Sequence, residues 1–278
     1  MPRYSFTQPR CPDRISVVDI ETSAPPQPED AFPPWPLHSP IVAGVLNATR
    51  ERYCEWRFEM EVVNFVVDPT AAIERLSHLI EGRALVTFNG RGFDLPVLAL
   101  TAMKQQRFDL VGLTNAWQAH RFHGHHYDLA DMMSGYGAAR GCSLEKLCSA
   151  LGVPVKLDCD GSDVAELMAK RDFEAIDRYV SQDCAGTLCG FAAVEALRSN
   201  DPGYAGSLIS QFGRWIADQG LEHLRPFERI RGHEEYERLS LLAMAEAAIA
   251  ALDHRQHMKF VTNVPGPSGA FVQQASDL

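Results

Sequence analysis

Apolar residues recur along the first two hundred positions with two different spacings, and these spacings predict alternating strands and helices. Short β-branched runs predict strands at 16–20, 41–47, 61–67 and 84–88, with a shorter one at 124–128. Apolar side chains three and four positions apart predict helices at 71–81, 130–134, 143–151 and 172–197. Strands that alternate with helices are typical of an α/β fold.

The pattern becomes wholly helical after residue 200. Amphipathic helices are predicted at 204–219 and 234–257, joined by a charged link at 222–231. A polar segment containing Pro-Gly-Pro-Ser-Gly closes the chain. We therefore expect an α/β domain at residues 1–198, a helical C-terminal extension at 199–260 and a flexible tail at 261–278. The extension either packs on the first domain or mediates a dimer, so the oligomeric state stays open.

Two acidic residues stand in the first predicted strand. Asp19 and Glu21 follow an apolar run, and side chains two positions apart on a strand share one face, about 7 Å apart. Two carboxylates on one buried face are costly unless positive charge compensates them. Mg²⁺ and Mn²⁺ prefer oxygen ligands and would supply that charge. The alternative is a strand that ends at Asp19, with both acids in solvent.

Three further residues have a suitable setting for a polar site. Asp94 follows a strand and a glycine-rich turn and begins a helix, which places it at the carboxyl end of a strand, although an N-cap role is an alternative. Tyr179 and Asp183 are four positions apart on a predicted helix and therefore lie on the same face. A core tyrosine beside a surface acid is the other interpretation of that pair.

Composition narrows the range of partners. The chain has 278 residues, 46% hydrophobic and 22% charged, which is typical of a soluble globular protein. Its net charge of −10 provides no general attraction for long duplex nucleic acid. The N-terminus lacks the apolar run of a signal peptide, and the 239–252 segment is too short to span a bilayer, so we expect a cytoplasmic protein without a membrane partner. Its seven cysteines lack zinc-ligand spacing and are expected to be buried thiols.

Two other groups of residues leave alternatives open. His123, His125 and His126 form a histidine-rich segment, but no further histidine or cysteine falls at a spacing that would complete a zinc site. Phe32 and Trp35 lie in the proline-rich connection at 23–40. They either stack on a nucleic-acid base or anchor this loop on the core.

Three segments together resemble the 3′–5′ exonucleases with a ribonuclease-H-like fold. Asp19-Ile20-Glu21-Thr22 is similar to their first motif, Asn89-Gly90-Arg91-Gly92-Phe93-Asp94 to the second, and Tyr179-Val180-Ser181-Gln182-Asp183 to the tyrosine form of the third. This Asp-Glu-Asp-Asp subclass with tyrosine is shared with ribonuclease D and with polymerase proofreading domains.

Further segments narrow the resemblance to a stand-alone bacterial family. They are Phe-Asn-Gly-Arg-Gly-Phe-Asp-Leu-Pro-Val-Leu at 88–98, Pro-Trp-Pro-Leu-His at 34–38, and Asp160-Gly161-Ser162. Members of that family are predicted 3′–5′ exonucleases related to the proofreading domain of family B DNA polymerases. The resemblance covers residues 14–198. This chain departs from the family's Tyr-Cys-Glu-x-Asp at Val180 and Ser181, which affects local packing or a modest substrate contact.

The resemblance implies a ribonuclease-H-like mixed β-sheet flanked by helices, and a catalytic site that holds two divalent metal ions, Mg²⁺ or Mn²⁺, about 3.5–4 Å apart. Asp19 would bridge both ions, Glu21 and Asp183 would complete the first-metal site, and Asp94 would support the second. Tyr179 would orient the attacking water. The implied substrate contacts are Thr22 and Asn89 to the terminal sugar or phosphate, Phe93 to the terminal base, and Arg91 and Lys156 to phosphate. A surface-turn role is an equal alternative for Arg91.

Three functions follow as hypotheses. The leading one is metal-dependent 3′–5′ hydrolysis of single-stranded nucleic acid, with DNA favoured and nucleoside 5′-monophosphates released. The second is trimming of RNA 3′ ends, as in proteins similar to ribonuclease D or oligoribonuclease. The third is a non-catalytic interaction module on the same fold, which the complete set of acids argues against.

Overall fold

A five-stranded mixed sheet forms the centre of the protein. The computed structural model describes residues 11–27, 32–122, 125–155 and 164–262, with side chains described through residue 252. The sheet has the order β3–β2–β1–β4–β5. Its strands are β1 (Arg14–Ser23), β2 (Ser39–Arg50), β3 (Trp56–Asn64), β4 (Ala84–Thr87) and β5 (His126–Asp128). The first three strands are antiparallel, whereas β4 and β5 run parallel to β1 and to each other.

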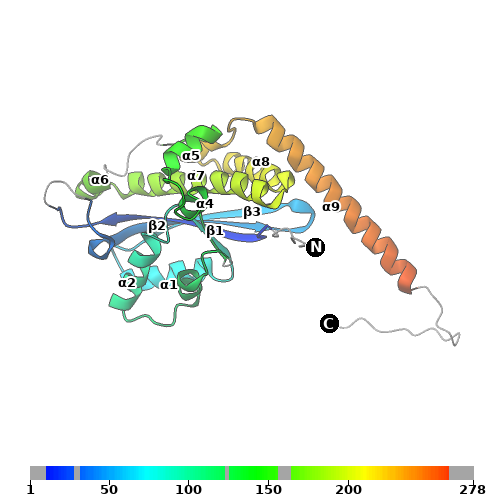
Figure 1. Cartoon of the computed structure of the whole chain (residues 1–278). Helices are drawn as coiled ribbons and strands as arrows, with labels where there is room; N and C mark the ends of the chain where they lie inside the picture. Colours follow the sequence, from blue (N-terminus) through cyan, green and yellow to red (C-terminus); the bar gives the residue numbers. More distant parts are fainter. Residues whose placement is uncertain (1–10, 28–31, 123–124, 156–163, 263–278) are drawn as a thin grey trace, which may run out of the picture.

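Helices cover both faces of this sheet (Figure 1). One face carries α1 (Pro69–Ile80), α2 (Asp94–Lys104) and α3 (Val111–Gln118). The other face carries the long helix α7 (Phe173–Ser199), together with α4 (Leu129–Met133), α5 (Leu144–Leu151), α6 (Val164–Lys170) and α8 (Pro202–Gln219). The short 3₁₀ helices are η2 (Trp35–Leu37), η3 (Arg52–Cys54) and η5 (Glu222–Phe227). The expected mixed β-sheet flanked by helices is confirmed.

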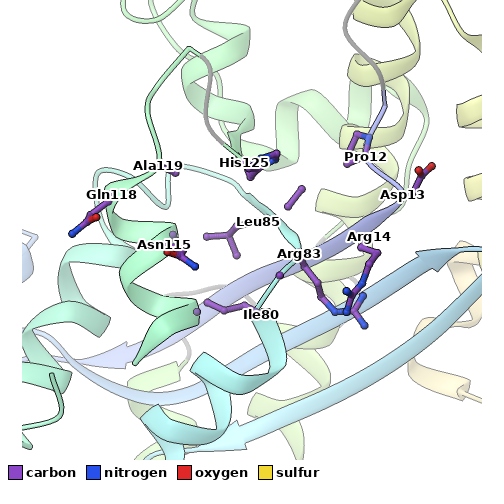
Figure 2. Close-up of a pocket in the computed structure, with 14 residues that line it drawn as sticks. Pro12, Asp13, Arg14, Ile80, Arg83, Leu85, Asn115, Gln118, Ala119 and His125 are labelled. Atoms are coloured by element: carbon purple, nitrogen blue, oxygen red, sulfur yellow. The ribbon is translucent and has the colours of Figure 1, made fainter. Parts of the chain in front are cut away.

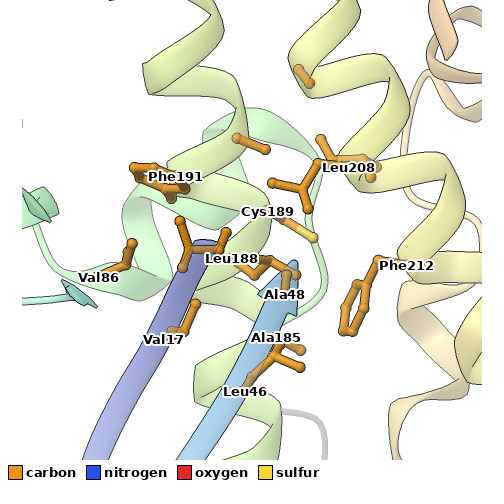
Figure 3. Packing of buried hydrophobic residues seen from close by; sticks show 14 of the residues in the cluster. Val17, Leu46, Ala48, Val86, Ala185, Leu188, Cys189, Phe191, Leu208 and Phe212 are labelled. Atoms are coloured by element: carbon orange, nitrogen blue, oxygen red, sulfur yellow. The ribbon is translucent and has the colours of Figure 1, made fainter. Parts of the chain in front are cut away.

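The alternation of side chains along β1 divides the core into two layers. Ile15 and Val17 belong to a cluster that includes residues of α7 and α8, whereas Val18 and Ile20 pack with α1, α2 and α3. Figure 3 shows Leu188 of α7 close to β1 and β2, with Phe212 on the neighbouring helix. Burial of each large apolar side chain contributes roughly 1.5–3 kcal/mol to folding. Helix α8 therefore shares the core of the α7 layer.

The helix-terminating signals in the sequence behave as expected. Ser143 caps α5 by accepting a hydrogen bond from the Lys146 N–H, and Gly152 ends that helix in the left-handed conformation. The carboxylate of Asp172 accepts from the Ala175 N–H and so fixes the start of α7.

Several elements differ from the sequence-based expectation. β3 was expected at 61–67 but covers Trp56–Asn64, because Trp56 and Phe58 face the α7 layer and 65–67 form a turn. Helix α3 was not expected, since its first residue follows Leu110, which provides no side-chain cap. The link at 222–231 contains the 3₁₀ helix η5. Helix α9 (His233–Thr262) is longer than the predicted 234–257 and extends away from the body in Figure 1.

The state of the cysteines and the character of the helices can be compared with what the sequence predicts. Cys11, Cys54, Cys148, Cys184 and Cys189 are buried free thiols, and Cys142 is a half-buried one; Cys159 lies outside the described residues. Among the described helices, none combines the length and the apolar character that crossing a membrane requires. The predicted tail at 261–278 lies almost entirely outside the described residues, and the Asp160-Gly161-Ser162 segment also lies outside them.

Candidate active site

The central strand presents two carboxylates to the α7 side of the sheet. Asp19 and Glu21 alternate with Val18 and Ile20, which face the α1–α3 layer. The two acids therefore share the face of Ile15 and Val17, as the alternation in the sequence predicts. A register irregularity between Glu21 and Thr22 follows directly. Such irregularities bend a strand and are frequent beside active sites.

Helix α7 places a third carboxylate and a tyrosine over this part of β1. One carboxylate oxygen from each of Asp19, Glu21 and Asp183 lies within 4.8 Å of the others. Tyr179, one turn before Asp183, is only 8% exposed, and its hydroxyl hydrogen-bonds to the Asp183 carboxylate. Residues separated by more than 150 positions in the chain thus form one acidic cluster.

Gly44 allows α7 to approach the sheet at this point. It lies on β2 directly opposite Asp19. A Cβ atom on Gly44 would lie 2.9 Å from Cys184 Sγ and 3.1 Å from the carbonyl oxygen of Val180, both in α7. Because Gly44 has no side chain, α7 can pack closely on β2 and bring Tyr179 and Asp183 near Asp19 on the neighbouring strand.

Asp94 approaches the acidic cluster from α2, which covers the face of the sheet opposite α7. It is the first residue of α2, 5% exposed, and its carboxylate accepts hydrogen bonds from its own backbone N–H and from that of Ile20. Ile20 stands between Asp19 and Glu21, so Asp94 is fixed beside both. The N-cap alternative is wrong, because Phe93 is the N-cap of α2 and Asp94 is its first helical residue. The Ile20 bond instead joins α2 to the acidic strand.

Burial and mutual repulsion make the four acids hard to ionise together. Burial, then the charges of Asp183, Asp94 and Glu21, raise the pKa of Asp19 well above its ordinary value. Burial and the charges of Asp183 and Asp94 raise the pKa of Glu21 to about 8. Burial, with a contribution from Asp128, raises the pKa of Asp94 to about 7. A divalent cation would stabilise the ionised forms, and a set of carboxylate oxygens suits Mg²⁺ or Mn²⁺.

These raised pKa values predict how the metal-free protein responds to pH. Glu21 ordinarily titrates near 4.5 but near 8 in the folded state, and Asp94 moves from 3.8 to about 7. Between these limits the folded state binds more protons than the unfolded one, so the free energy of unfolding falls as pH rises. We expect the Tm in EDTA to drop between pH 5 and pH 8, and saturating Mn²⁺ to raise the Tm more at pH 8 than at pH 5. The Asp183→Ala variant should show a weaker trend, and an equal metal effect at both pH values would contradict this account.

The turn before Asp94 is held by a residue that the sequence analysis did not select. Asp128, at the end of β5, accepts hydrogen bonds from the backbone N–H groups of Asn89 and Arg91 at 2.9 Å each. Asn89 adopts a positive φ of 65°, and a Cβ on Gly90 would lie 2.5 Å from Thr87 Oγ1. The sequence signal was the acidic end of a predicted strand, which is too common to identify such a role.

Arg91 also holds this region together. Its guanidinium donates to the carbonyl oxygens of Ala119 at 2.8 Å and His126 at 2.9 Å. Those contacts fit the structural alternative for Arg91, and its proposed phosphate contact stays a prediction. Lys156 lies outside the described residues, so nothing tests its predicted role.

The histidines divide into different environments. His126 is 3% exposed and its Nε2 lies 2.8 Å from Thr87 Oγ1; burial lowers its pKa to about 3. His125 is exposed, and His123 lies outside the described residues. Within the described part of the chain, the group of metal-ligating side chains that forms a cluster is the acidic one.

An aromatic group adjoins the irregular end of β1. Thr22 Oγ1 lies 2.7 Å from His38 Nδ1, and His38 Nε2 donates to the Pro33 carbonyl at 3.0 Å. The His38 ring meets Phe93 edge-on at 4.8 Å, and Phe32 lies 5.8 Å from Phe93 while 76% exposed. His38 thus connects Thr22 and Phe93, two of the expected substrate contacts. In the sequence, His38 stands out only as the last residue of the Pro-Trp-Pro-Leu-His segment at 34–38.

The two departures from the resembled third motif are accommodated inside α7. Val180 is fully buried against Gly44 and the β2 side of the sheet. Ser181 is 3% exposed and donates to the Asp177 carbonyl one turn earlier at 2.7 Å. Both therefore satisfy their local packing without disturbing the neighbouring Asp183.

Comparisons with known proteins were made for the whole chain. Residues 30–229 match a family model described as a predicted 3′–5′ exonuclease related to the exonuclease domain of PolB. Among solved structures, the chain is similar to the family B DNA polymerase from the hyperthermophilic archaeon Pyrobaculum calidifontis, with 16% identity and a TM-score of 0.41. That match covers 76% of this chain and 30% of the polymerase chain, so this chain spans less than a third of its length. No curated protein sequence matches.

Proposed function

The chain belongs to the family of predicted 3′–5′ exonucleases related to the exonuclease domain of PolB, and from that premise we propose that it removes nucleotides from the 3′ end of single-stranded nucleic acid, with DNA favoured. The observation that carries this proposal is the convergence of Asp19, Glu21 and Asp183 within 4.8 Å. Asp94 is hydrogen-bonded to the same strand beside them. Asp94 is buried and the other three acids are half-buried, so four carboxylates from three distant segments have a large unfavourable charge energy unless cations are bound.

Asp19, Glu21, Asp94 and Asp183 would hold two divalent cations, Mg²⁺ or Mn²⁺. When bound, such cations activate a water molecule and stabilise the leaving 3′-oxygen in a displacement at phosphorus. The Ile20 backbone N–H would hold the Asp94 carboxylate in place, and the Tyr179 hydroxyl would hold that of Asp183. In this proposal Asp19 would help to hold both ions, because it is the carboxyl group on which the charges of all three other acids act.

Tyr179 acts as a hydrogen-bond donor in this proposal. Burial and the charges of Asp183, Glu21 and Asp19 raise its pKa further above the ordinary value of 10. The phenol therefore stays protonated at neutral pH and does not serve as a general base. A protonated hydroxyl beside Asp183 can orient a water molecule or a phosphate oxygen.

The group formed by Thr22, His38, Phe93 and Phe32 is the proposed place for the terminal nucleotide. The exposed faces of Phe93 and Phe32 would stack on a base without reading its sequence. Thr22, oriented by His38, would contact the terminal sugar. With a net charge of −10, the protein depends on bound metal and stacking to hold a strand, which favours single strands over long duplex.

The test uses DNA and RNA single strands of equal sequence, each labelled at the 3′ or the 5′ end. We expect stepwise shortening from the 3′ end, dependent on Mg²⁺ or Mn²⁺ and abolished by EDTA. The Asp183→Ala variant should be inactive, whereas Glu174→Ala, which removes an exposed acid from the same helix, should be active. Faster shortening of RNA would favour the RNA-trimming alternative, and no cleavage of either polymer under any condition would contradict an exonuclease.

A further inference from the structure

A second candidate ligand site lies on the opposite face of the sheet from the acids. It is a cleft of about 670 Å³ between the start of β1, β4 and helix α3 (Figure 2). Arg14, which lines it, is separated from Asp19 by five strand positions, so the two side chains point to opposite faces about 17 Å apart along β1. Its volume is within the range of small-molecule sites, about 300–1,000 Å³.

Two arginines give one end of this cleft a positive charge. Figure 2 shows the side chains of Arg14 and Arg83 running toward each other. Arg83 donates to the Thr49 hydroxyl at 3.0 Å and the Ala48 carbonyl at 3.4 Å. Within the described part of the chain, neither guanidinium forms an ion pair; Asp13, at the rim, lies 3.8 Å from Arg50. Burial and the adjacent charge of Arg14 lower the pKa of Arg83, and they outweigh the charge of Glu59, which raises it. Two neighbouring cations, one partly desolvated, favour a bound anion.

The rest of the cleft is apolar with amides on its far side. Ile80, Leu85 and Ala116 line it and are buried. Asn115 and Gln118 project from α3 on the side opposite the arginines in Figure 2. An apolar wall can accept a flat ring, and side-chain amides can hydrogen-bond to ring nitrogens and carbonyls. The arrangement therefore suits a molecule with an anionic end and a polar-edged ring.

We propose that this cleft binds a nucleoside monophosphate, with the phosphate at Arg14 and Arg83 and the base between the apolar wall and Asn115. Arginine binds phosphate oxygens through paired N–H donors, which explains why two guanidinium groups lie at one end. A free phosphate would leave the apolar wall and the amides without contacts, and an uncharged nucleoside would leave the arginines uncompensated. The proposal does not depend on catalysis at Asp19, since the two sites lie on different faces of the sheet.

Binding is measured by isothermal titration of the full chain with AMP in EDTA, so that no cation can hold a phosphate among the acids. We expect one AMP per chain, and a Kd at least about tenfold weaker in Arg14→Gln and Arg83→Gln, because each loses a charge-assisted contact. Arg14 is exposed, so its variant should fold even if Arg83→Gln does not. Arg75→Gln removes the same charge from the outer side of α1 and should bind AMP unchanged.

The ligand class is tested by titrating inorganic phosphate and adenosine in parallel. AMP should bind at least about tenfold more tightly than either fragment, and Asn115→Ala should weaken AMP but leave phosphate unchanged. Equal affinity for phosphate and AMP, or AMP binding that is insensitive to both arginine changes, would overturn the proposal. The Asp183→Ala variant should bind AMP normally, so failure of the exonuclease assay and failure of this site are separate results.

Discussion

Replacement of Asp19 by asparagine is expected to lower the rate of 3′-end hydrolysis by at least about a thousandfold, about 4 kcal/mol of transition-state stabilisation. The amide keeps the shape of the side chain but removes the central negative charge of the acidic cluster. The same change should raise the Tm in EDTA, because it removes a carboxyl group whose ionisation is disfavoured in the folded state by desolvation and by Asp183, Asp94 and Glu21. Each kcal/mol gained corresponds to a rise of about 2–4 °C in a chain of this size class.

This explanation requires that Asp19→Asn lowers the nuclease activity and raises the Tm in EDTA. Activity on a 3′-labelled strand and the Tm in EDTA are measured on the same preparation. Asp109→Asn, which changes an exposed acid paired with Arg107, serves as the matched control and should alter neither by much. An Asp19→Asn protein that retains activity, or that unfolds earlier than the unsubstituted protein in EDTA, would show that Asp19 is not a repelled metal ligand.

The second large effect is expected at Gly44. An alanine there brings its Cβ to 2.9 Å from Cys184 Sγ and 3.1 Å from the Val180 carbonyl oxygen. Helix α7 must then move outward, and overpacking of this kind typically costs about 1–3 kcal/mol. Because the same helix carries Asp183, activity should fall more than tenfold even in molecules that stay folded. Chemical denaturation and the nuclease assay measure the two effects separately.

A compensating substitution distinguishes this explanation from general damage to β2. Cys184→Ala removes the sulfur atom that lies nearest to the new methyl group, so the double variant Gly44→Ala/Cys184→Ala should recover part of both losses. Gly141→Ala, at a glycine whose nearest neighbour would be 4.0 Å away, is the control. If the double variant loses as much stability and activity as the two single variants added together, contact with Cys184 is not what displaces the helix.

The sequence was sufficient for those features that depend on local periodicity. The alternation around Asp19 and Glu21 places both acids on one face, and the four-residue spacing places Tyr179 over Asp183, as the structure shows. The strand–turn–helix pattern likewise predicts Asp94 at the start of a helix. In each case the neighbours that decide the geometry are within a few positions of the residue.

Features that depend on contacts between distant segments could not be obtained in this way. Gly44 matters because β2 pairs with β1 in a register that sets it opposite Asp19. Asp128 and His38 matter because their hydrogen-bond partners, the Asn89 N–H and the Thr22 hydroxyl, come from other segments of the chain. No spacing within one segment encodes such pairs. The early start of β3 has the same origin, since Trp56 is fixed by Ser207 and Gln211 of α8.

The contact between β3 and α8 bears on which segments of the chain form one domain. The sequence places a domain boundary at 198, yet Leu208 and Phe212 share one cluster with Val17 of the acidic strand. A protein cut at that boundary would open a long apolar surface on the back of α7, the helix that carries Asp183. We expect α8 to be inherited together with the segments that carry the acids, as one evolutionary unit. The C-terminal half of α9, which extends away from the body in Figure 1, is the part in which we expect substitutions to be tolerated.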